Sequence, residues 1–517
     1  MSLTSTILGI LAALGTPQAP PTDAPVSCEA LVGKTAAVEV TGATVLTPEP
    51  AVTIETASFY RPHPVTVPFC RVEGVIEDSI GFELWLPETW NGRMLGTGVG
   101  GDAGIFNYTD MSLRIGQGFA TVSTDTGHKD DEAHWMLDPK KRADYEHRAV
   151  HLTAQAARVL IERHYGKPAQ RAYFTGCSGG GRQAMKEMQL YPQDYDGILA
   201  GAPAPYMPLQ SVRMLWFSLM QQQRPEAALR DTDWSLYERA VTKQCDAIDG
   251  VLDGIVENPA RCTFDTAVLQ CKAGQSEGCI PAKRLAMLNT IVAPMRDATG
   301  ARMDDGLFPG VRTRPGPPSP LLRSMWADGV YGDPEWDERS FQQVPALALA
   351  NKRMPQLRAD STEIGGFLER GGKAIIYQGW QDPSTNAGLA LDYYADLAAA
   401  RGGDETLAQS VRMFMVPGMY HCGGGPGVDL FGGSTHAPLA NGADPSRDML
   451  WALIDWVERD RTPQSIVGAR NVPGGAGFTR RLCPFPQAAV YDGTGPQREA
   501  ASYRCELDPV LANMLPG

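Results

Sequence analysis

The sequence predicts an α/β fold, and two patterns carry this prediction. An apolar run at residues 171–175 leads into the glycine-rich turn 176–180, and residues 181–188 after the turn are rich in helix formers. Two later apolar runs, 373–377 and 412–416, each lead into a polar loop. A strand, a sharp turn and a helix in this order are typical of an α/β architecture.

The turn 176–180 has the pattern Gly-x-Ser-x-Gly, with Ser178 at its centre. In this pattern the serine occupies a strained turn, and the flanking glycines relieve crowding where strand and helix approach each other. The pattern also occurs in glycine-rich connectors that hold an incidental serine. The strand before the turn and the helix after it favour Ser178 as a nucleophile.

A serine hydroxyl becomes a good nucleophile when a base takes its proton, and a carboxylate must hold that base in the correct tautomer. In the α/β-hydrolase layout the acid follows a later strand, and the histidine lies in a loop further along the chain. Asp382 follows the run 373–377, and His421 follows the run 412–416. Asp382 taken alone is an ordinary turn residue before Pro383. Together with the histidine loop, it predicts a triad of Ser178, Asp382 and His421.

The ten cysteines form an even set, as expected of disulfides made in an oxidising compartment. Cys177 immediately precedes Ser178, and Cys422 immediately follows His421. A bond between them would hold their Cα atoms within about 7 Å and so bring nucleophile and base together. A redox or metal-binding pair is the competing interpretation, but the sequence contains no C-x-x-C spacing.

Three segments resemble the tannase and feruloyl esterase family: the turn 176–182, the loop 379–383 and the stretch 417–427. The likeness extends from about residue 27 to residue 486. It implies a serine esterase in which a disulfide joins the cysteine before the serine to the cysteine after the histidine. The mono-hydroxyethyl-terephthalate hydrolase of plastic degradation belongs to the same family. The resemblance also implies four further disulfides: Cys28 with Cys70, Cys245 with Cys262, Cys271 with Cys279, and Cys483 with Cys505.

An oxyanion hole is the next requirement, because the tetrahedral intermediate places negative charge on the former carbonyl oxygen. One donor should be the backbone N–H of Gly179, the residue after the nucleophile. The second should come from an early glycine-rich loop, and residues 94–104 fit that description. The resemblance assigns this donor to Gly101. A phosphate-binding loop is a weak alternative, since the lysine of a P-loop is missing.

An acidic segment follows Cys245 and carries Asp246, Asp249 and Asp253 between glycines. Carboxylates at this spacing suit calcium, although the spacing differs from that of an EF-hand. An acidic surface turn is an equal alternative on these residues alone. The resemblance implies a structural calcium ion held by Asp246, Asp249, the Val251 carbonyl, Asp253 and the Ile255 carbonyl. No organic cofactor is expected.

The length of 517 residues predicts two domains. We expect a catalytic α/β-hydrolase core split over residues 27–205 and 366–517. Residues 206–365 form an inserted lid domain that carries the acidic loop and the proline-rich stretch 312–320. Residues 447–458 show apolar positions at helical spacing, so we assign their tryptophans to the core.

Composition excludes several partners. With 46 basic and 59 acidic residues the net charge is −13, and no basic cluster suits nucleic acid. No apolar run reaches the length of a membrane span. Residues 1–26 are signal-like or disordered, although no lysine or arginine precedes the apolar run 7–14. Because the cysteines support export, we expect a secreted or periplasmic protein, and the sequence does not specify its oligomeric state.

We therefore predict a serine esterase that cleaves small esters of aromatic, phenolic acids through an acyl-enzyme. A terephthalate half-ester hydrolase is an enzymatic alternative, with Arg323 as the candidate lid cation for the free carboxylate. A non-catalytic, calcium-dependent binding protein is the alternative of another class. The lid residues that bind substrate are not identifiable from the sequence, and His128 is assigned a packing role.

Overall fold

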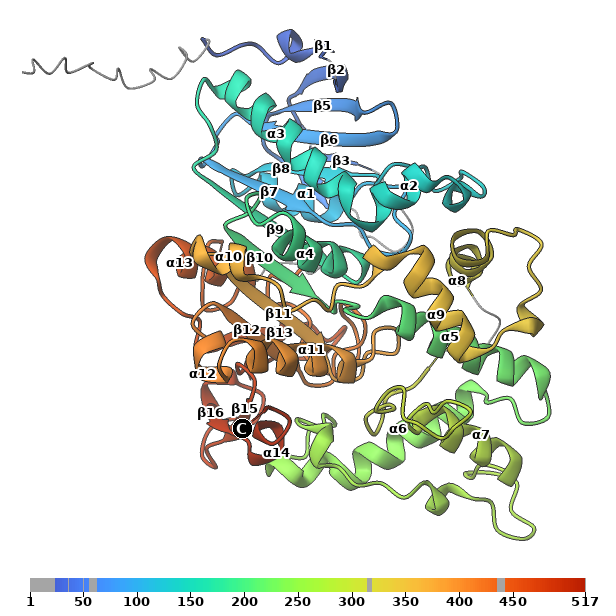
Figure 1. The fold of residues 1–517 in the computed structure, drawn as a ribbon. Coiled ribbons are helices and arrows are strands. Elements are labelled where there is room, and N and C mark those ends of the chain that lie inside the picture. Colours follow the sequence, from blue (N-terminus) through green and yellow to red (C-terminus); the bar gives the residue numbers. More distant parts are fainter. Residues whose placement is uncertain are drawn as a thin grey trace, which may run out of the picture.

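A computed structural model describes residues 24–35, 37–49, 51–54, 63–313, 319–434 and 442–516. Most of the signal-like segment 1–26, and residues 314–318 of the proline-rich stretch, lie outside the described residues. Figure 1 shows one large sheet and, beside it, a separate group of helices.

The large sheet has ten strands in the order β1-β2-β5-β6-β8-β7-β9-β10-β11-β12. The strands from β7 onward along the chain run parallel to one another, while β1, β2, β5 and β6 form an antiparallel extension that joins through β8. The ten strands are β1 (Gly33–Lys34), β2 (Val38–Leu46), β5 (Phe69–Ile76), β6 (Ile80–Pro87), β7 (Arg93–Thr97), β8 (Ala120–Thr124), β9 (Arg171–Cys177), β10 (Gly197–Gly201), β11 (Lys373–Gly379) and β12 (Val411–Val416).

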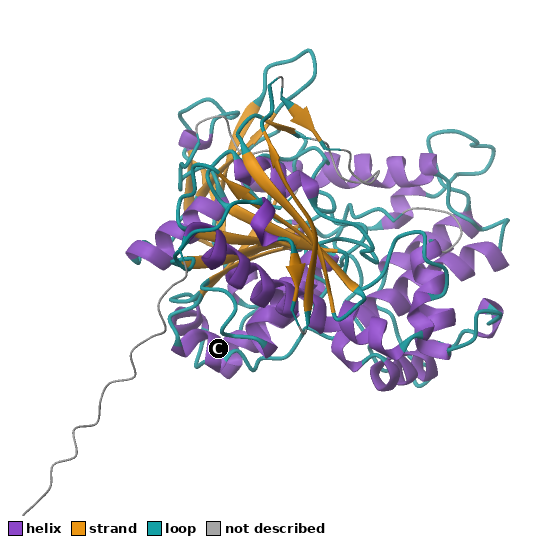
Figure 2. Ribbon diagram, turned by 90° about the horizontal axis from the view of Figure 1, so that it is seen from above, coloured by secondary structure: helices purple, strands orange, loops and turns teal. Residues whose placement is uncertain are grey.

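Helices cover both faces of this sheet, which appears from above as a twisted fan in Figure 2. The flanking helices are α1 (Tyr108–Ile115), α2 (Pro139–Ala143), α3 (Ala149–Tyr165), α4 (Gly179–Leu190), α10 (Gly365–Glu369), α11 (Ala387–Ala400), α12 (Asp404–Leu407), α13 (Met449–Arg459) and α14 (Pro509–Ala512). Three two-stranded sheets complete the core: β3 (Val52–Thr53) with β4 (Pro64–Val65), β13 (Ile466–Arg470) with β14 (Phe478–Leu482), and β15 (Gln487–Tyr491) with β16 (Tyr503–Leu507).

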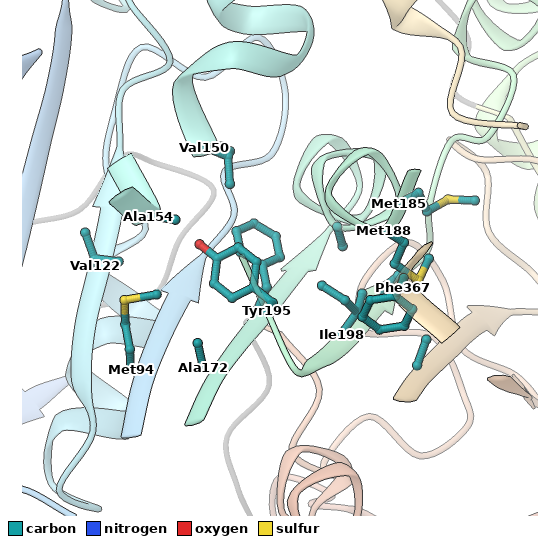
Figure 3. Packing of buried hydrophobic residues seen from close by; sticks show 14 of the residues in the cluster. Met94, Val122, Val150, Ala154, Ala172, Met185, Met188, Tyr195, Ile198 and Phe367 are labelled. Carbon is teal, nitrogen blue, oxygen red and sulfur yellow. The ribbon is translucent and has the colours of Figure 1, made fainter. Parts of the chain in front are cut away.

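Neighbouring residues of the central strands enter different hydrophobic clusters because side chains alternate across a strand. Ala172 and Phe174 of β9 pack under α3, α4 and α11, whereas Tyr173 packs with α13. Part of the first cluster, including Val150 of α3 and Met185 of α4, is drawn in Figure 3. Trp456 of α13 is fully buried in the second cluster and Trp451 packs against it, which confirms their core assignment.

The segment predicted as the lid lies between β10 and β11 and contributes no strand to the large sheet among its described residues. Its helices gather beside the sheet in Figure 1. They are α5 (Met207–Gln223), α6 (Asp231–Cys245), α7 (Ala282–Val292), α8 (Pro320–Ser324) and α9 (Gln343–Arg353), with a π-helical stretch at Met325–Tyr331. Its domain boundaries and its covering role remain predictions.

Candidate active site

Ser178 stands alone between β9, which ends at Cys177, and α4, which begins at Gly179. Its backbone has φ 62° and ψ −121°, an unfavourable conformation for a residue with a side chain. The Ser178 N–H donates to the Gly201 carbonyl of β10 at 3.0 Å, which ties the turn to the sheet. This strained strand-to-helix turn is the geometry predicted for a nucleophile.

The glycines around Ser178 allow three backbone segments to meet. A Cβ atom on Gly181 would lie 2.2 Å from the Gly201 carbonyl oxygen, and one on Gly176 would lie 2.5 Å from the Gly180 carbonyl oxygen. A Cβ atom on Gly180 would lie 2.9 Å from the carbonyl carbon of Gly98. Since the obstructing atoms belong to the backbone, none can move aside cheaply. The turn therefore needs glycine at positions that the Gly-x-Ser-x-Gly pattern only partly specifies.

Asp382 follows β11 and is fully buried at the side chain. Its Oδ2 atom lies 2.8 Å from His421 Nδ1 and accepts the Thr385 hydroxyl at 2.6 Å, while Oδ1 accepts two backbone amides of its own loop. Burial raises the pKa of the Asp382 carboxyl, but the charge and hydrogen bond of His421 and the bonds from Thr385 outweigh this effect. The net pKa lies below its ordinary value, so the carboxylate stays ionised and can orient His421.

The structure forms all five disulfides implied by the resemblance. In the Cys177–Cys422 bridge the Cα atoms are 6.0 Å apart across a sequence separation of 245 residues. Each cysteine is the chain neighbour of a predicted triad residue. The bridge therefore brings the loop of His421 against the turn of Ser178.

The predicted oxyanion loop packs on the nucleophile turn. Gly98 N–H donates to Thr175 of β9 at 2.8 Å, and a Cβ atom on Gly179 would lie 3.0 Å from the Gly101 carbonyl oxygen. Gly101 has φ +64°, which suits glycine. The N–H of Gly179 lies in the first turn of α4, where amides have no acceptor within the helix. Both predicted donors therefore border Ser178.

Tyr145 contacts the predicted oxyanion loop, and the sequence analysis missed it. Its hydroxyl donates to the Gly101 carbonyl at 3.1 Å, and its side chain is almost fully buried. Arg182 of α4 donates to the Tyr145 carbonyl at 3.0 Å and stacks its guanidinium on the Tyr145 ring. Tyr145 lies in a π-helical stretch, Asp144–Arg148, and no local sequence pattern connects it to the oxyanion loop.

A cavity of about 740 Å³ borders the catalytic loops and the inserted segment. Gln381 and Tyr420, the residues before Asp382 and His421, form one wall, and α6 forms the other. The Tyr420 hydroxyl donates to Glu238 of α6 at 3.2 Å. The inserted segment thus directly contacts the loops that carry the predicted acid and base.

His128 packs beside Tyr145, near the predicted oxyanion loop, whereas Arg323 lies in the inserted segment with a half-exposed side chain. The His128 ring stacks on Trp135 with centroids 3.5 Å apart, and burial lowers its pKa to about 4. It is a packing residue, as predicted. Arg323 is half exposed and lies 3.9 Å from Glu338, which gives no support to a role in binding a substrate carboxylate.

The acidic loop folds its carboxylates back onto its own amides. Asp246 accepts from Gly254, Asp249 from Val251 and Asp253 from Ile255. Among the described residues, no group of three acidic, histidine or cysteine side chains is arranged to hold a metal ion. Asp249 Oδ2 is nevertheless buried without a hydrogen-bond partner, and burial raises the pKa of Asp249 to about 6. The oxygen donors and this unsatisfied atom suit calcium, whereas the ligand cage itself is not formed.

Arg480 supplies positive charge to the same loop, and the sequence analysis missed it. Its guanidinium is buried, pairs with Asp253 and lies 3.9 Å from Glu257. It also stacks on the Tyr503 ring. Arg480 and a calcium ion would therefore compete for the charge of Asp253.

A model of the family described as "Tannase and feruloyl esterase" matches residues 65–316 and 335–506. The chain belongs to the tannase and feruloyl esterase family. Among its relatives, a probable feruloyl esterase B-1 of Aspergillus terreus is 31% identical over 466 residues, which cover 86% of this chain and 87% of the relative. A probable feruloyl esterase B-2 of Aspergillus oryzae is 32% identical over 454 residues, which cover 84% and 86%.

Solved structures agree with this membership. The crystal structure of feruloyl esterase B from Aspergillus oryzae has a TM-score of 0.85 and 27% identity, and covers 93% of this chain and 100% of that chain. Tannin acyl hydrolase from Aspergillus niger has a TM-score of 0.75 and 20% identity, covering 94% and 95%, and shows the shared fold. This member of the tannase and feruloyl esterase family is a carboxylic ester hydrolase that acts on small esters, which rules against a non-catalytic binding protein.

Proposed function

We propose that this esterase hydrolyses esters of aromatic hydroxy acids through an acyl-enzyme on Ser178. The observation that carries the proposal is the His421–Asp382 hydrogen bond of 2.8 Å on a loop that the Cys177–Cys422 bridge joins to the Ser178 turn. Nucleophile, base and acid then share one site, as acyl transfer requires.

In the first step Ser178 Oγ attacks the ester carbonyl carbon, and His421 takes the hydroxyl proton. The tetrahedral intermediate collapses when the bond to the alcohol oxygen breaks and His421 returns the proton to that oxygen. Water then attacks the acyl-enzyme with His421 as base, and Ser178 leaves as the hydroxyl. Asp382 stabilises the imidazolium in both steps, and the amides of Gly101 and Gly179 bind the oxyanion.

The decisive test replaces the nucleophile. Ser178→Ala should lower kcat by roughly 10⁶-fold on an aryl ester while the melting temperature stays close to that of the wild type. Folded Ser178→Ala protein with near wild-type activity would contradict the assignment.

The acyl group is the finer part of the proposal, and the names of the family and of the relatives support a feruloyl esterase or tannase type. Rates on methyl ferulate, methyl gallate and a terephthalate half-ester would rank the alternatives. We expect a phenolic ester to have the largest kcat/KM. A larger kcat/KM for the terephthalate half-ester would contradict the assignment to phenolic esters.

We also propose a structural calcium ion at the acidic loop, held by Asp246, Asp249, Asp253 and the carbonyls of Val251 and Ile255. The ion would supply charge compensation to a loop whose Asp249 Oδ2 lacks a partner. The loop belongs to the segment predicted as the lid, so the ion would stabilise the fold rather than join the chemistry.

A secreted or periplasmic location is the last part of the proposal. Five disulfides among the described residues support an oxidising compartment. No helix in the described part of the chain is long and apolar enough to cross a membrane.

A further inference from the structure

The loop that carries the catalytic acid is held by a residue of the inserted segment. This acid loop, residues 382–386, follows β11 and leads into α11. Asp382 Oδ1 accepts the amides of Ser384 at 2.7 Å and Thr385 at 2.9 Å. The Thr385 hydroxyl and the Gln378 side-chain amide of β11 both donate to Oδ2. The backbone path at residues 384 and 385 therefore helps to set the orientation of the carboxylate.

Gln210 of α5 bonds to the two residues on either side of Thr385. Its Nε2 donates to the Ser384 carbonyl at 2.6 Å, and its Oε1 accepts the Asn386 N–H at 3.0 Å. The residue is 7% exposed, so water cannot readily replace these bonds. One side-chain amide thus pairs with a donor and an acceptor of the acid loop.

A second bond from the inserted segment reaches the same loop. Asn386 Nδ2 donates to the Gly306 carbonyl at 2.8 Å, and this bond is also buried. Residues 210 and 306 lie far apart within the insertion. The acid loop is therefore bonded by two separate residues of the inserted segment.

We propose that Gln210 is a positioning residue for catalysis, so that the inserted segment is part of the catalytic framework and not only a cover. Gln210 fixes Ser384 and Asn386, these fix the amides and hydroxyl around Asp382, and Asp382 orients His421. The proposal rests on the proposed triad. It also means that α5 cannot move away from the acid loop without disturbing the catalytic acid.

Gln210→Met removes both hydrogen bonds and keeps an unbranched side chain of similar length. We expect kcat on methyl ferulate to fall at least tenfold and up to about a hundredfold, as for a misplacement of about 1 Å, with KM changed by less than about twofold. The matched control is Gln189→Met, because Gln189 Nε2 also donates to backbone carbonyls, those of Ala359 and Ser361. The control should keep kcat within about twofold of the wild type.

A double-mutant cycle separates positioning from loss of structure. If Gln210 acts through Asp382, Gln210→Met should have little further effect on kcat in the Asp382→Asn background. An equal fold-loss in both backgrounds would overturn the proposal, as would wild-type kcat in folded Gln210→Met. An equal kcat loss in the Gln189→Met control would also overturn it.

Two outcomes need their own interpretation. If Asp382→Asn alone leaves kcat unchanged, the proposed triad fails, and the Gln210 proposal fails with it. If Gln210→Met does not fold, Gln210→Glu takes its place in the same cycle. Above the pKa of the introduced carboxyl, glutamate keeps the acceptor for Asn386 but loses the donor to Ser384, so the same loss of kcat is expected there, and wild-type kcat under that condition would overturn the proposal.

Discussion

The predicted nucleophile turn 176–181 and the acidic loop 245–255 hold their side chains in place by different physical means. In the turn, crowding between backbones places Ser178: the obstructing atoms near Gly176, Gly180 and Gly181 are all main-chain atoms. In the acidic loop, three carboxylates are placed near one another, and Arg480 partly compensates their charge. Steric placement needs nothing but the chain, whereas a cluster of like charges needs a counter-charge. The turn is therefore complete as folded, whereas the acidic loop would gain charge compensation from the proposed calcium ion.

Removal of the Cys177–Cys422 bridge should have the largest effect on the turn. Cys177→Ala with Cys422→Ala should cost about 2–5 kcal/mol of unfolding free energy and roughly a hundredfold in kcat, since His421 loses its register with Ser178. The control replaces Cys271 and Cys279, whose bridge spans 8 residues in the insertion, and should leave kcat unchanged. Non-reducing peptide mapping should find the Cys177 peptide joined to that of Cys422. Equal kcat losses in both variants would mean that the bridge has no special role in register.

Gly181→Ala should have the next largest effect on the turn. Alanine favours a helix over glycine, but its Cβ atom would meet the Gly201 carbonyl oxygen at 2.2 Å. We expect a loss of about 1–3 kcal/mol by chemical denaturation and a clear drop in kcat. Gly116→Ala is the matched control, because Gly116 has φ −63° and open space around it. If both variants gain stability, backbone crowding does not shape the turn.

Tyr145→Phe tests how the second oxyanion donor is held. Loss of the bond to Gly101 should lower kcat about tenfold, or about 1.4 kcal/mol, with KM unchanged. Affinity for a boronic acid transition-state analogue should fall by a similar factor. Tyr165→Phe removes a comparable bond, from its hydroxyl to the Pro87 carbonyl at 2.7 Å, and should leave kcat unchanged. Unchanged affinity of Tyr145→Phe for the analogue would mean that Tyr145 does not hold the oxyanion donor in place.

Calcium removal should have the smallest effect on chemistry. Chelation should lower the melting temperature, and calcium at a hundred times its Kd should restore about 3 kcal/mol of stability, with kcat nearly constant. Asp249→Asn should abolish this response. Asp297→Asn should not, because Asp297 lies in an exposed turn and accepts only from its own loop. If elemental analysis finds no divalent metal and added calcium shifts no melting curve, Arg480 alone compensates the loop.

The sequence by itself determined which residues are predicted to carry the chemistry. The strand, turn and helix around Ser178 were predicted to within two residues, and Asp382 and His421 follow β11 and β12 as expected. These features depend on local sterics and on the order of strands along the chain, and short stretches of sequence determine both. The Cys177–Cys422 pair followed from the positions of these cysteines beside Ser178 and His421, whereas the other four disulfide pairs came from the family resemblance, since ten cysteines allow many pairings.

Tertiary structure decided what holds those residues in place. Tyr145, Gln210 and Arg480 act on loops that are 44, 174 and 227 residues away in the chain, and no spacing or periodicity marks them. The same is true of Gly181, whose constraint comes from the Gly201 backbone of a neighbouring strand. Long-range contacts depend on which elements pack together. A local pattern can therefore predict which residue reacts, but only the packed fold shows what positions it.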